Sequence, residues 1–274
     1  YELVVFRHDE SDMMSRFLVT FLITFLLSIV GIEAALAAVD PWGVRYFDDV
    51  QSIWQASAPD VTGYSFKPGR YIFGPTAFTI EADGLRAVPG RDSSGPRVAF
   101  VGDSVTFGQG VNDADTWVSL MAAALRLNAM NHGRSAYSIA NVARVLDGID
   151  GCAVFLTIAN DPAPAQHYRA SRPYPALWLS RYLMLILTPP AIPAYSDRYA
   201  PLYEAVAARP DTLILAFDDG EYGNIMRDEY GAVLIPPFTS RISVSDAHAD
   251  AEGNRQIADA ARPIIQNWLD ERNC

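Results

Sequence analysis

Cysteine and basic residues are both scarce in this sequence, and each scarcity argues against a class of protein. Two cysteines among 274 residues cannot build a disulfide framework or a metal site made of thiolates. Lys and Arg total 21 against 32 Asp and Glu, which gives a formal net charge of −11. Nucleic acids and anionic lipids attract clustered positive charge, so this balance argues against nucleic acid as a partner and against electrostatic attachment to a membrane.

The two cysteines have two interpretations. Cys152 lies in an apolar run, which favours a small core residue. The alternative is a single bridge between Cys152 and Cys274, which requires export to an oxidising compartment. Two cysteines define no spacing pattern, so the first interpretation is preferred and the second stays open.

One long run without charge extends from Phe17 to Ile32, directly after Arg16, and alanines are frequent in residues 34–38. A basic flank, an apolar stretch and an Ala-x-Ala pattern are typical of a signal peptide, and residues 17–38 are also long enough for a membrane anchor. A buried core helix is disfavoured, because the run is apolar on all faces. Both interpretations predict that the rest of the chain is exported, to the periplasm or outside the cell, either released or attached to a membrane through residues 17–38.

Composition divides the chain into four segments. Residues 1–15 are an extension of uncertain status, with Met13 or Met14 as alternative starts, and residues 16–38 are the export element. Residues 39–92 form a lead-in segment rich in aromatic residues and turn formers. A linker-like stretch, GRDSSGP, separates it from the main domain, which is expected over residues 93–274.

The lead-in segment alternates aromatic and polar residues. Tyr64 and Phe66 form one such pair and Tyr71 and Phe73 another, with KPGR between them, which predicts a small β-hairpin. Aromatic residues at a period of two are typical of a buried face, so we expect them in the core. An exposed face that binds carbohydrate is the alternative.

From residue 97 onward, strand-like and helix-like patterns alternate. This alternation predicts an α/β fold, a three-layer α/β/α sandwich with a mostly parallel sheet covered on both faces. The expected strands cover residues 97–101, 127–131, 152–159, 212–217 and 232–235. The expected buried helix stripes are Trp117, Leu120, Met121, Ala124 and Leu125; Ile139, Val142, Ala143 and Leu146; and Ile257, Ala261, Ile264, Ile265, Trp268 and Leu269, with a bend at Pro263.

Residues 176–187, ALWLSRYLMLIL, form a second apolar stretch. It is too short to span a membrane, and Arg181 interrupts it. A packed helix near the entrance of the site is the favoured interpretation. A surface that rests on a membrane is the alternative.

The stretch VAFVGDSVTFG places a serine, Ser104, directly after an expected strand, where groups gather at the carboxyl edge of a parallel sheet. A serine hydroxyl needs a base, and the base needs a group that orients it. His8 precedes the export element, and His132 and His167 have no acidic residue placed nearby for this task, whereas Asp246 precedes His248 by two residues. We therefore expect Ser104, Asp246 and His248 to form a catalytic triad, with Asp250 as a rival partner of His248.

An oxyanion intermediate also needs hydrogen-bond donors. Two loops after expected strands offer them, NHGRS and TIANDP. Gly133 allows close approach of a backbone N–H, and the side chain of Asn160 can donate. Either residue alone is a common turn residue, so the prediction rests on their joint occurrence with the triad.

These stretches together resemble the four sequence blocks of the SGNH (GDSL-type) hydrolases, and the resemblance covers residues 98–262. The blocks are GDSVTFG, the glycine of NHG, the Asn-Asp of AND, and DAHADAEGNRQIA. The resemblance implies a three-layer α/β/α fold, a Ser104 nucleophile, a His248 base and Asp246 as its partner. It also implies oxyanion donors from the Ser104 and Gly133 backbone and from Asn160, and the lead-in resembles that of some exported bacterial members.

The sequence departs from the family pattern at three places. Ile158 stands where the third block often has glycine, and Asp246 lies two rather than three residues before His248. Arg134 follows Gly133, where the second block often continues apolar. We interpret Arg134 either as a cation that recognises an acidic or sugar-linked substrate or as a solvated surface residue.

The expected function is therefore an exported serine esterase or deacylase, which acts on a small-molecule or glycan ester and needs no metal or cofactor. An O-acyltransferase that uses the same triad on an envelope or extracellular glycan is the first alternative. An inert carbohydrate-binding protein of the same fold is the second, and the intact set of site residues argues against it.

Overall fold

The computed structural model of the chain forms two compact units. One contains residues 1–44 and 172–190, and the other contains residues 45–171 and 191–274. The structure describes residues 5–39, 52–56, 64–162, 177–180, 183, 195, 197–242, 246–272 and 274.

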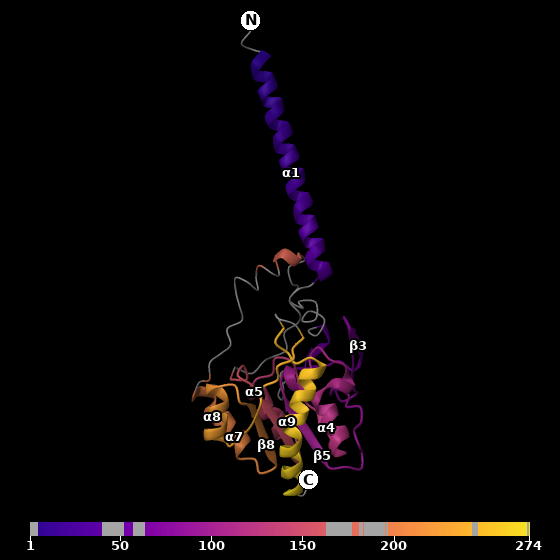
Figure 1. Cartoon of the computed structure of the whole chain (residues 1–274), viewed down its shortest axis with the longest axis vertical. Helices are drawn as coiled ribbons and strands as arrows, with labels where there is room; N and C mark the ends of the chain where they lie inside the picture. The colour runs from indigo at the N-terminus through magenta and orange to yellow at the C-terminus, as the bar shows by residue number, and fades with distance from the viewer. Residues whose placement is uncertain are drawn as a thin grey trace. The chain divides into compact units, whose positions relative to one another are not determined.

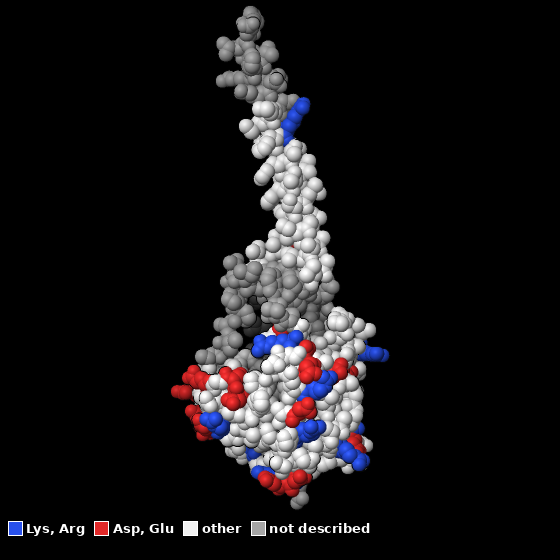
Figure 2. Space-filling model, in the orientation of Figure 1, with Lys and Arg blue, Asp and Glu red and all other residues white. Residues whose placement is uncertain are grey.

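The first unit contains the apolar run as one helix, α1 (Val5–Val39). The stretch Met13–Val39 has a mean hydropathy of 2.3, and none of the residues in its most apolar part is buried. Figure 2 shows the described side chains of this helix almost without charge. In the described part of the chain it is the one helix long and apolar enough to cross a membrane, which fits a signal or anchor by length and composition.

Glu33 is the acidic residue within the apolar stretch Met13–Val39, and its carboxylate has partners in the same unit. The backbone N–H groups of Trp178 and Leu179 donate to it at 2.7 and 2.9 Å. Two hydrogen bonds lower the cost of placing a charge in an apolar surrounding. The second apolar stretch, expected over residues 176–187, is described only at 177–180 and 183, and Arg181 lies outside the described residues.

The second unit is built on a five-stranded sheet in which all neighbouring strands are parallel, in the order β6-β5-β7-β8-β9. Every residue of β7 is buried, and so is every residue of β5 and β8 except the first of each strand. These strands are buried on both sides because helices cover both faces of the sheet. The prediction of a mostly parallel sheet in an α/β fold is confirmed (Figure 1). The strands are β5 (Arg97–Gly102), β6 (Asn128–Asn131), β7 (Cys152–Thr157), β8 (Thr212–Phe217) and β9 (Val233–Ile235).

Two groups of helices form the outer layers (Figure 1). One core cluster joins the sheet to α4 (Trp117–Leu125) and α9 (Ala251–Asp270), which continues through Pro263. The other cluster joins it to α5 (Ile139–Asp147), α7 (Ala200–Ala207) and α8 (Glu221–Tyr230). The remaining short helices are α3 (Ser104–Phe107) and the 3₁₀ turns η1 (Asp113–Asp115) and η2 (Asp197–Tyr199).

The buried stripe of α4 differs from the expected one at several positions. Ala124 is exposed, while Val118 and Ala122 are buried beside Trp117 and Met121. The helix therefore turns a slightly different face toward the sheet, because α9 packs against it as well. The expected stripes of α5 and α9 lie in the core clusters.

The lead-in segment forms two hairpin-like pairs, so the predicted hairpin between residues 64–66 and 71–73 is wrong. Strand β2 (Tyr64–Phe66) pairs antiparallel with the earlier β1 (Trp54–Ala56). Strand β3 (Gly69–Phe73) pairs with the later β4 (Thr76–Ile80). Gly74, with a φ of 59°, and Pro75 make the tight turn that joins β3 to β4. The KPGR stretch connects two pairs instead of turning one.

The lead-in aromatics belong to the main core, as the period-two pattern predicted. Phe66 and Phe78 are buried and contact Phe107 of α3, with ring centroids 4.9 and 5.7 Å apart. Arg86 is buried over the rings of Phe78 and Phe107, and it forms an ion pair with Asp113 at 3.0 Å. Its guanidinium also donates to the carbonyl oxygens of Phe107, Gly108 and Val111 at 2.5–2.8 Å. The lead-in therefore braces the loop that follows Ser104.

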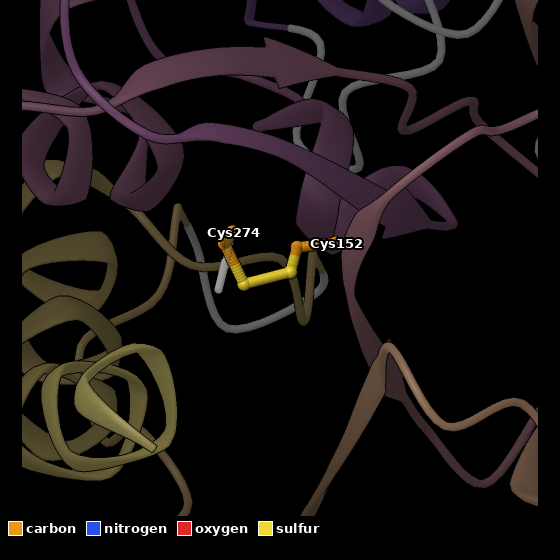
Figure 3. Close-up of a disulfide and its surroundings, with 2 residues drawn as sticks. All are labelled: Cys152 and Cys274. Atoms are coloured by element: carbon orange, nitrogen blue, oxygen red, sulfur yellow. A yellow bond between two sulfur atoms is a disulfide. The ribbon is translucent and has the colours of Figure 1, made fainter. Parts of the chain in front are cut away.

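The two cysteines form a disulfide, which the sequence left as the less favoured alternative. Figure 3 shows Cys274 joined to Cys152 at the start of β7, with Cα atoms 5.8 Å apart. Cys152 is also buried, so it occupies the core as well. Helix α9 lies on the sheet and ends near the start of β7, which brings together two residues 122 positions apart.

Candidate functional site

Ser104 begins a short helix immediately after strand β5, which lies next to the central strand of the sheet. The carboxylate of Asp103 accepts a hydrogen bond from the N–H of Val105 at 2.8 Å and caps this helix, α3. Gly102 has no room for a side chain, since a Cβ there would lie 2.3 Å from Thr106 Oγ1. The sequence Gly-Asp-Ser thus ends a strand, caps a helix and holds the serine at the carboxyl edge of the sheet.

The structure brings the three predicted triad residues together. Ser104 Oγ lies 2.9 Å from His248 Nε2, and His248 Nδ1 lies 2.6 Å from Asp246 Oδ1. Asp246 Oδ1 also accepts the backbone N–H of His248 at 3.0 Å, which fixes the carboxylate beside the ring. Ser104 and Asp246 are both buried, while His248 is half-buried. The arrangement is that of a nucleophile, a base and a group that orients the base.

The charge on Asp246 is stabilised by this geometry. Burial alone would raise the pKa of its carboxyl, but the hydrogen bonds and charge of His248 outweigh burial and hold that pKa below its ordinary value. Asp246 is therefore ionised at neutral pH. An ionised Asp246 accepts a hydrogen bond from Nδ1–H, which leaves the lone pair of Nε2 directed at Ser104 Oγ.

Asp250, the rival partner of His248, has other contacts. It caps α9 by accepting the N–H of Gly253 at 2.8 Å, and it accepts the hydroxyl of Ser240 at 2.7 Å. No hydrogen bond between the side chains of Asp250 and His248 is found among the described residues. The geometry thus gives the place beside the imidazole to Asp246.

Asn160 lies in the same cleft as Ser104 and His248. Its loop is fixed by the next residue, Asp161, whose buried carboxylate accepts from Thr157 Oγ1 at 2.8 Å and from the N–H of Ile158 at 2.9 Å. Burial raises the pKa of Asp161 well above its ordinary value, and the neighbouring Asp103 raises it further. The cleft has a volume of about 430 Å³ and is lined by Ser104, Val105, Ile158, Ala159, Asn160, Phe217, Asp219, Pro237, Phe238, Arg241, Ala247 and His248.

Gly133 is close to the nucleophile helix but does not line the cleft. A Cβ at this position would lie 2.1 Å from Phe107 N, so glycine is required for packing against α3. Its N–H donates to the side chain of Asn131 at 2.9 Å, and Asn131 in turn donates to Thr106 O at 3.0 Å. The structure thus directs this N–H to Asn131.

Arg134 does not line this cleft, and its side chain is buried rather than solvated. It is buried, donates to Gly84 O at 2.8 Å, and lies over the rings of Phe66 and Tyr137 at 5.3 and 6.0 Å. The side chain therefore holds the lead-in segment against the sheet. This burial does not fit a solvated surface position, and a substrate-binding role of Arg134 stays a prediction.

Of the histidines in the described part of the second unit, only His248 lines the cleft. His132 lines a different pocket, beside Arg134 and Arg97, where burial and then the charge of Arg134 lower its pKa to about 4. His8 lies within α1, and His167 lies outside the described residues. His248 is therefore the histidine that the structure places beside Ser104.

Sequence reasoning missed several residues of the cleft. Phe217 closes β8, but Asp219, Phe238 and Arg241 lie in irregular segments without periodicity, so no pattern marks them. Asp103 could have been found as the residue that caps the helix of the nucleophile. Within the described residues, no group of three His, Cys, Asp or Glu side chains is arranged to hold a metal ion.

Comparisons with known proteins give likeness of fold. No protein-family model and no curated protein matches the chain. Among solved structures, a member of the lipolytic protein G-D-S-L family from Veillonella parvula DSM 2008 is similar at 13% identity and a TM-score of 0.38, over 62% of this chain and 98% of that chain. A carbohydrate acetylesterase family member from Sinorhizobium meliloti is similar at 17% identity and a TM-score of 0.38, over 64% and 99%.

A family two carbohydrate esterase from Cellvibrio japonicus is also similar, at 15% identity and a TM-score of 0.39, over 68% of this chain and 65% of that chain.

Proposed function

We propose that this protein is an exported serine esterase that removes an O-acyl group through an acyl-enzyme intermediate. Ser104 is the nucleophile, His248 the general base and Asp246 the group that orients His248. One observation supports the proposal above all. Ser104 Oγ lies 2.9 Å from His248 Nε2, and His248 Nδ1 lies 2.6 Å from Asp246 Oδ1. Ser104 and His248 also line a cleft. A serine in an inert binding protein has no need of this arrangement.

In the first half-reaction, Ser104 Oγ attacks the acyl carbon while His248 Nε2 takes the hydroxyl proton. The carbonyl oxygen becomes an oxyanion in the tetrahedral intermediate. As the intermediate collapses, the C–O bond to the alcohol breaks, and the alcohol leaves with the proton from His248. The acyl group is then bound to Ser104 as an ester.

In the second half-reaction, a water molecule takes the place of the alcohol. His248 removes a proton from the water, whose oxygen attacks the acyl carbon, and a second tetrahedral intermediate forms. When it collapses, the bond to Ser104 Oγ breaks and the serine regains its proton from His248. The products are a carboxylic acid and the restored enzyme.

The oxyanion requires donors that are in place before the reaction. The N–H of Ser104 lies in the first turn of α3, where N–H groups lack partners within the helix. The side chain of Asn160 lines the same cleft. We assign the role of oxyanion donor to these two groups. The N–H of Gly133 donates to the side chain of Asn131, so it becomes a third donor only when it leaves Asn131 and donates to the substrate oxygen instead.

Export is part of the proposal. The apolar helix α1 supports it, and so does the disulfide, because bridges persist in oxidising compartments outside the cytoplasm. The contact of Glu33 with Trp178 and Leu179 favours a retained anchor over a cleaved signal, since cleavage after Ala37 would separate these partners. A C-terminal reporter that is active only in the cytoplasm should therefore stay silent.

The test is hydrolysis of p-nitrophenyl acetate and longer p-nitrophenyl esters by the wild type and by Ser104→Ala. We expect the substitution to lower kcat by about a thousandfold or more, because only binding and oxyanion donors remain. Ser93→Ala is the matched control, because Ser93 is exposed and does not line the cleft. Unchanged turnover in Ser104→Ala would refute the assignment, and transfer to an added oligosaccharide would identify an acyltransferase.

A further inference from the structure

Two aromatic rings and a guanidinium that contact one another are among the groups that line the cleft. Phe217, at the end of β8, contacts Phe238 edge to face, with ring centroids 5.5 Å apart. The guanidinium carbon of Arg241 lies 5.9 Å from the centroid of the Phe238 ring. All three residues line the cleft that contains Ser104 and His248. A guanidinium that rests on a ring is held in place, while its N–H edge stays available for hydrogen bonds.

The backbone of Arg241 is fixed relative to the proposed base. Residues 241 and 249 form an isolated antiparallel bridge, and the N–H of Ile242 donates to His248 O at 3.0 Å. Ser240 donates its hydroxyl to Asp250, the cap of α9, at 2.7 Å. The segment that carries Arg241 is thus paired with the segment that carries His248. A ligand group bound by Arg241 therefore has a defined position relative to the triad.

Arg241 has no ion-pair partner within the described part of the chain, whereas Arg227 and Arg255 each pair with a neighbouring carboxylate. Asp219 lines the same cleft, but the two charges are not paired with each other. The protein as a whole carries a formal charge of −11 and repels anions. An unpaired cation in the same cleft as Ser104 offsets that repulsion locally.

We propose that Arg241 binds an anionic group of the substrate, so that the preferred esters are acylated acidic compounds, such as acetylated uronic acid oligosaccharides. The inference rests on the proposed esterase function and adds the class of substrate. A carboxylate matches the planar N–H fork of a guanidinium and forms paired, charge-assisted hydrogen bonds with it. A phosphate group has the same chemistry, so the test includes both.

The experiment compares kcat/KM for three acetyl esters: an acetylated uronic acid oligosaccharide, an acetylated sugar phosphate and a neutral acetylated oligosaccharide. The readout is the ratio of each acidic ester to the neutral one, because a ratio cancels general effects on catalysis. We expect the wild type to prefer at least one acidic ester by about tenfold, the size expected for a charge-assisted hydrogen bond. Raising the salt concentration should reduce that preference.

Two variants and one control make the test specific. Arg241→Gln should bring the ratio close to one. Arg241→Lys should retain part of the preference for acidic esters, since lysine keeps the positive charge but lacks the paired N–H donors of the guanidinium. Arg255→Gln removes an exposed arginine of α9 that does not line the cleft, and should keep the wild-type ratio. A wild-type ratio near one, or a ratio that survives in Arg241→Gln, would overturn the inference.

The two proposals fail in different ways. If the wild type hydrolyses all three esters equally, it is an esterase and only the role of Arg241 is wrong. If it hydrolyses none of them and Ser104 does not react with a serine-directed probe, the esterase proposal falls, and the inference falls with it.

Discussion

Asp246 and Asp250 flank His248 at equal distance in the sequence, but their side chains have different neighbours. Asp246 accepts a hydrogen bond from the imidazole at 2.6 Å, while Asp250 caps α9 through Gly253. A carboxylate beside the ring selects the tautomer and stabilises the imidazolium that forms during catalysis. A helix cap needs only an acceptor oxygen, which Asn supplies as well as Asp.

The pair of substitutions Asp246→Asn and Asp250→Asn separates these roles. We expect Asp246→Asn to lower kcat/KM by about a thousandfold or more with little change in fold, because an amide cannot stabilise the imidazolium. Asp250→Asn should change the free energy of unfolding by about a few tenths of a kcal/mol and leave kcat/KM near the wild-type value. Thermal melts of both variants exclude unfolding as the cause. The reverse outcome would assign the third triad position to Asp250.

His132 gives a prediction about pH and stability. Its pKa in the folded protein is about 4, below the ordinary value of 6.5, because burial and then Arg134 disfavour its charged form. At pH values between 4 and 6.5, the unfolded chain therefore binds a proton at His132 that the folded chain does not bind. This contribution to stability is complete above pH 6.5 and is lost as the pH falls toward 4, by about 3 kcal/mol in all.

The measurement is the free energy of unfolding of the wild type and of His132→Gln between about pH 7 and about pH 4. Because the variant cannot take up this proton, the difference between the two proteins should shift with pH in that window, in favour of the variant at low pH. The absolute stability of the variant does not matter for this comparison. A difference that stays constant with pH would contradict the lowered pKa of the half-buried His132.

At the scale of elements, Gly133 lets the loop after β6 pack directly on α3. An added Cβ would lie 2.1 Å from Phe107 N and 2.5 Å from Thr106 C, which are backbone atoms of the nucleophile helix. Gly133→Ala must therefore move α3 or the loop. We expect a loss of about 1–3 kcal/mol in the free energy of unfolding, together with slower ester hydrolysis.

Gly148→Ala is the matched control for Gly133→Ala. Gly148 follows α5 with a φ of −91°, and the nearest atom to an added Cβ lies 3.6 Å away. This space is ordinary van der Waals contact, so the substitution should be close to neutral in denaturant melts and in kcat/KM. Equal effects of the two substitutions would show that close packing against α3 is not what requires Gly133.

The elements that the sequence predicts best are those whose pattern comes from burial. Apolar runs such as residues 212–217 indicate strands covered on both faces, and β8 has these bounds. The hairpin at residues 64–73 was predicted wrongly because β2 is three residues long and finds its partner in β1. A short strand carries no signal that identifies its partner, and tertiary packing decides the pairing.

The candidate site divides in the same way. Ser104, His248 and Asp246 have the required chemistry at a recognisable spacing, so the sequence could predict that they meet. Arg241 has no such pattern, because it enters the cleft through an irregular segment and a contact with Phe238. The burial of Arg134 could not be predicted, because its neighbours, Gly84 and Phe66, come from the distant lead-in segment.

At the scale of the whole molecule, the disulfide ties the C-terminal end of α9 to the start of the central strand β7. It closes a chain segment of 122 residues, which restricts the unfolded state strongly. We expect Cys274→Ser to lower the free energy of unfolding by about 2–4 kcal/mol. The check is a melt of the wild type with and without reductant: reductant should reproduce the loss in the wild type and have no effect on the variant.

The central claim is that Ser104 is a nucleophile activated by His248, and a fluorophosphonate probe tests it most directly. A base-activated hydroxyl attacks the phosphorus atom and stays covalently labelled, whereas an ordinary serine does not react. Digestion and mass spectrometry of the labelled wild type should place the adduct on Ser104. Ser104→Ala should carry no adduct, and His248→Ala should react far more slowly. An adduct on another residue, or labelling that survives in Ser104→Ala, would contradict the account.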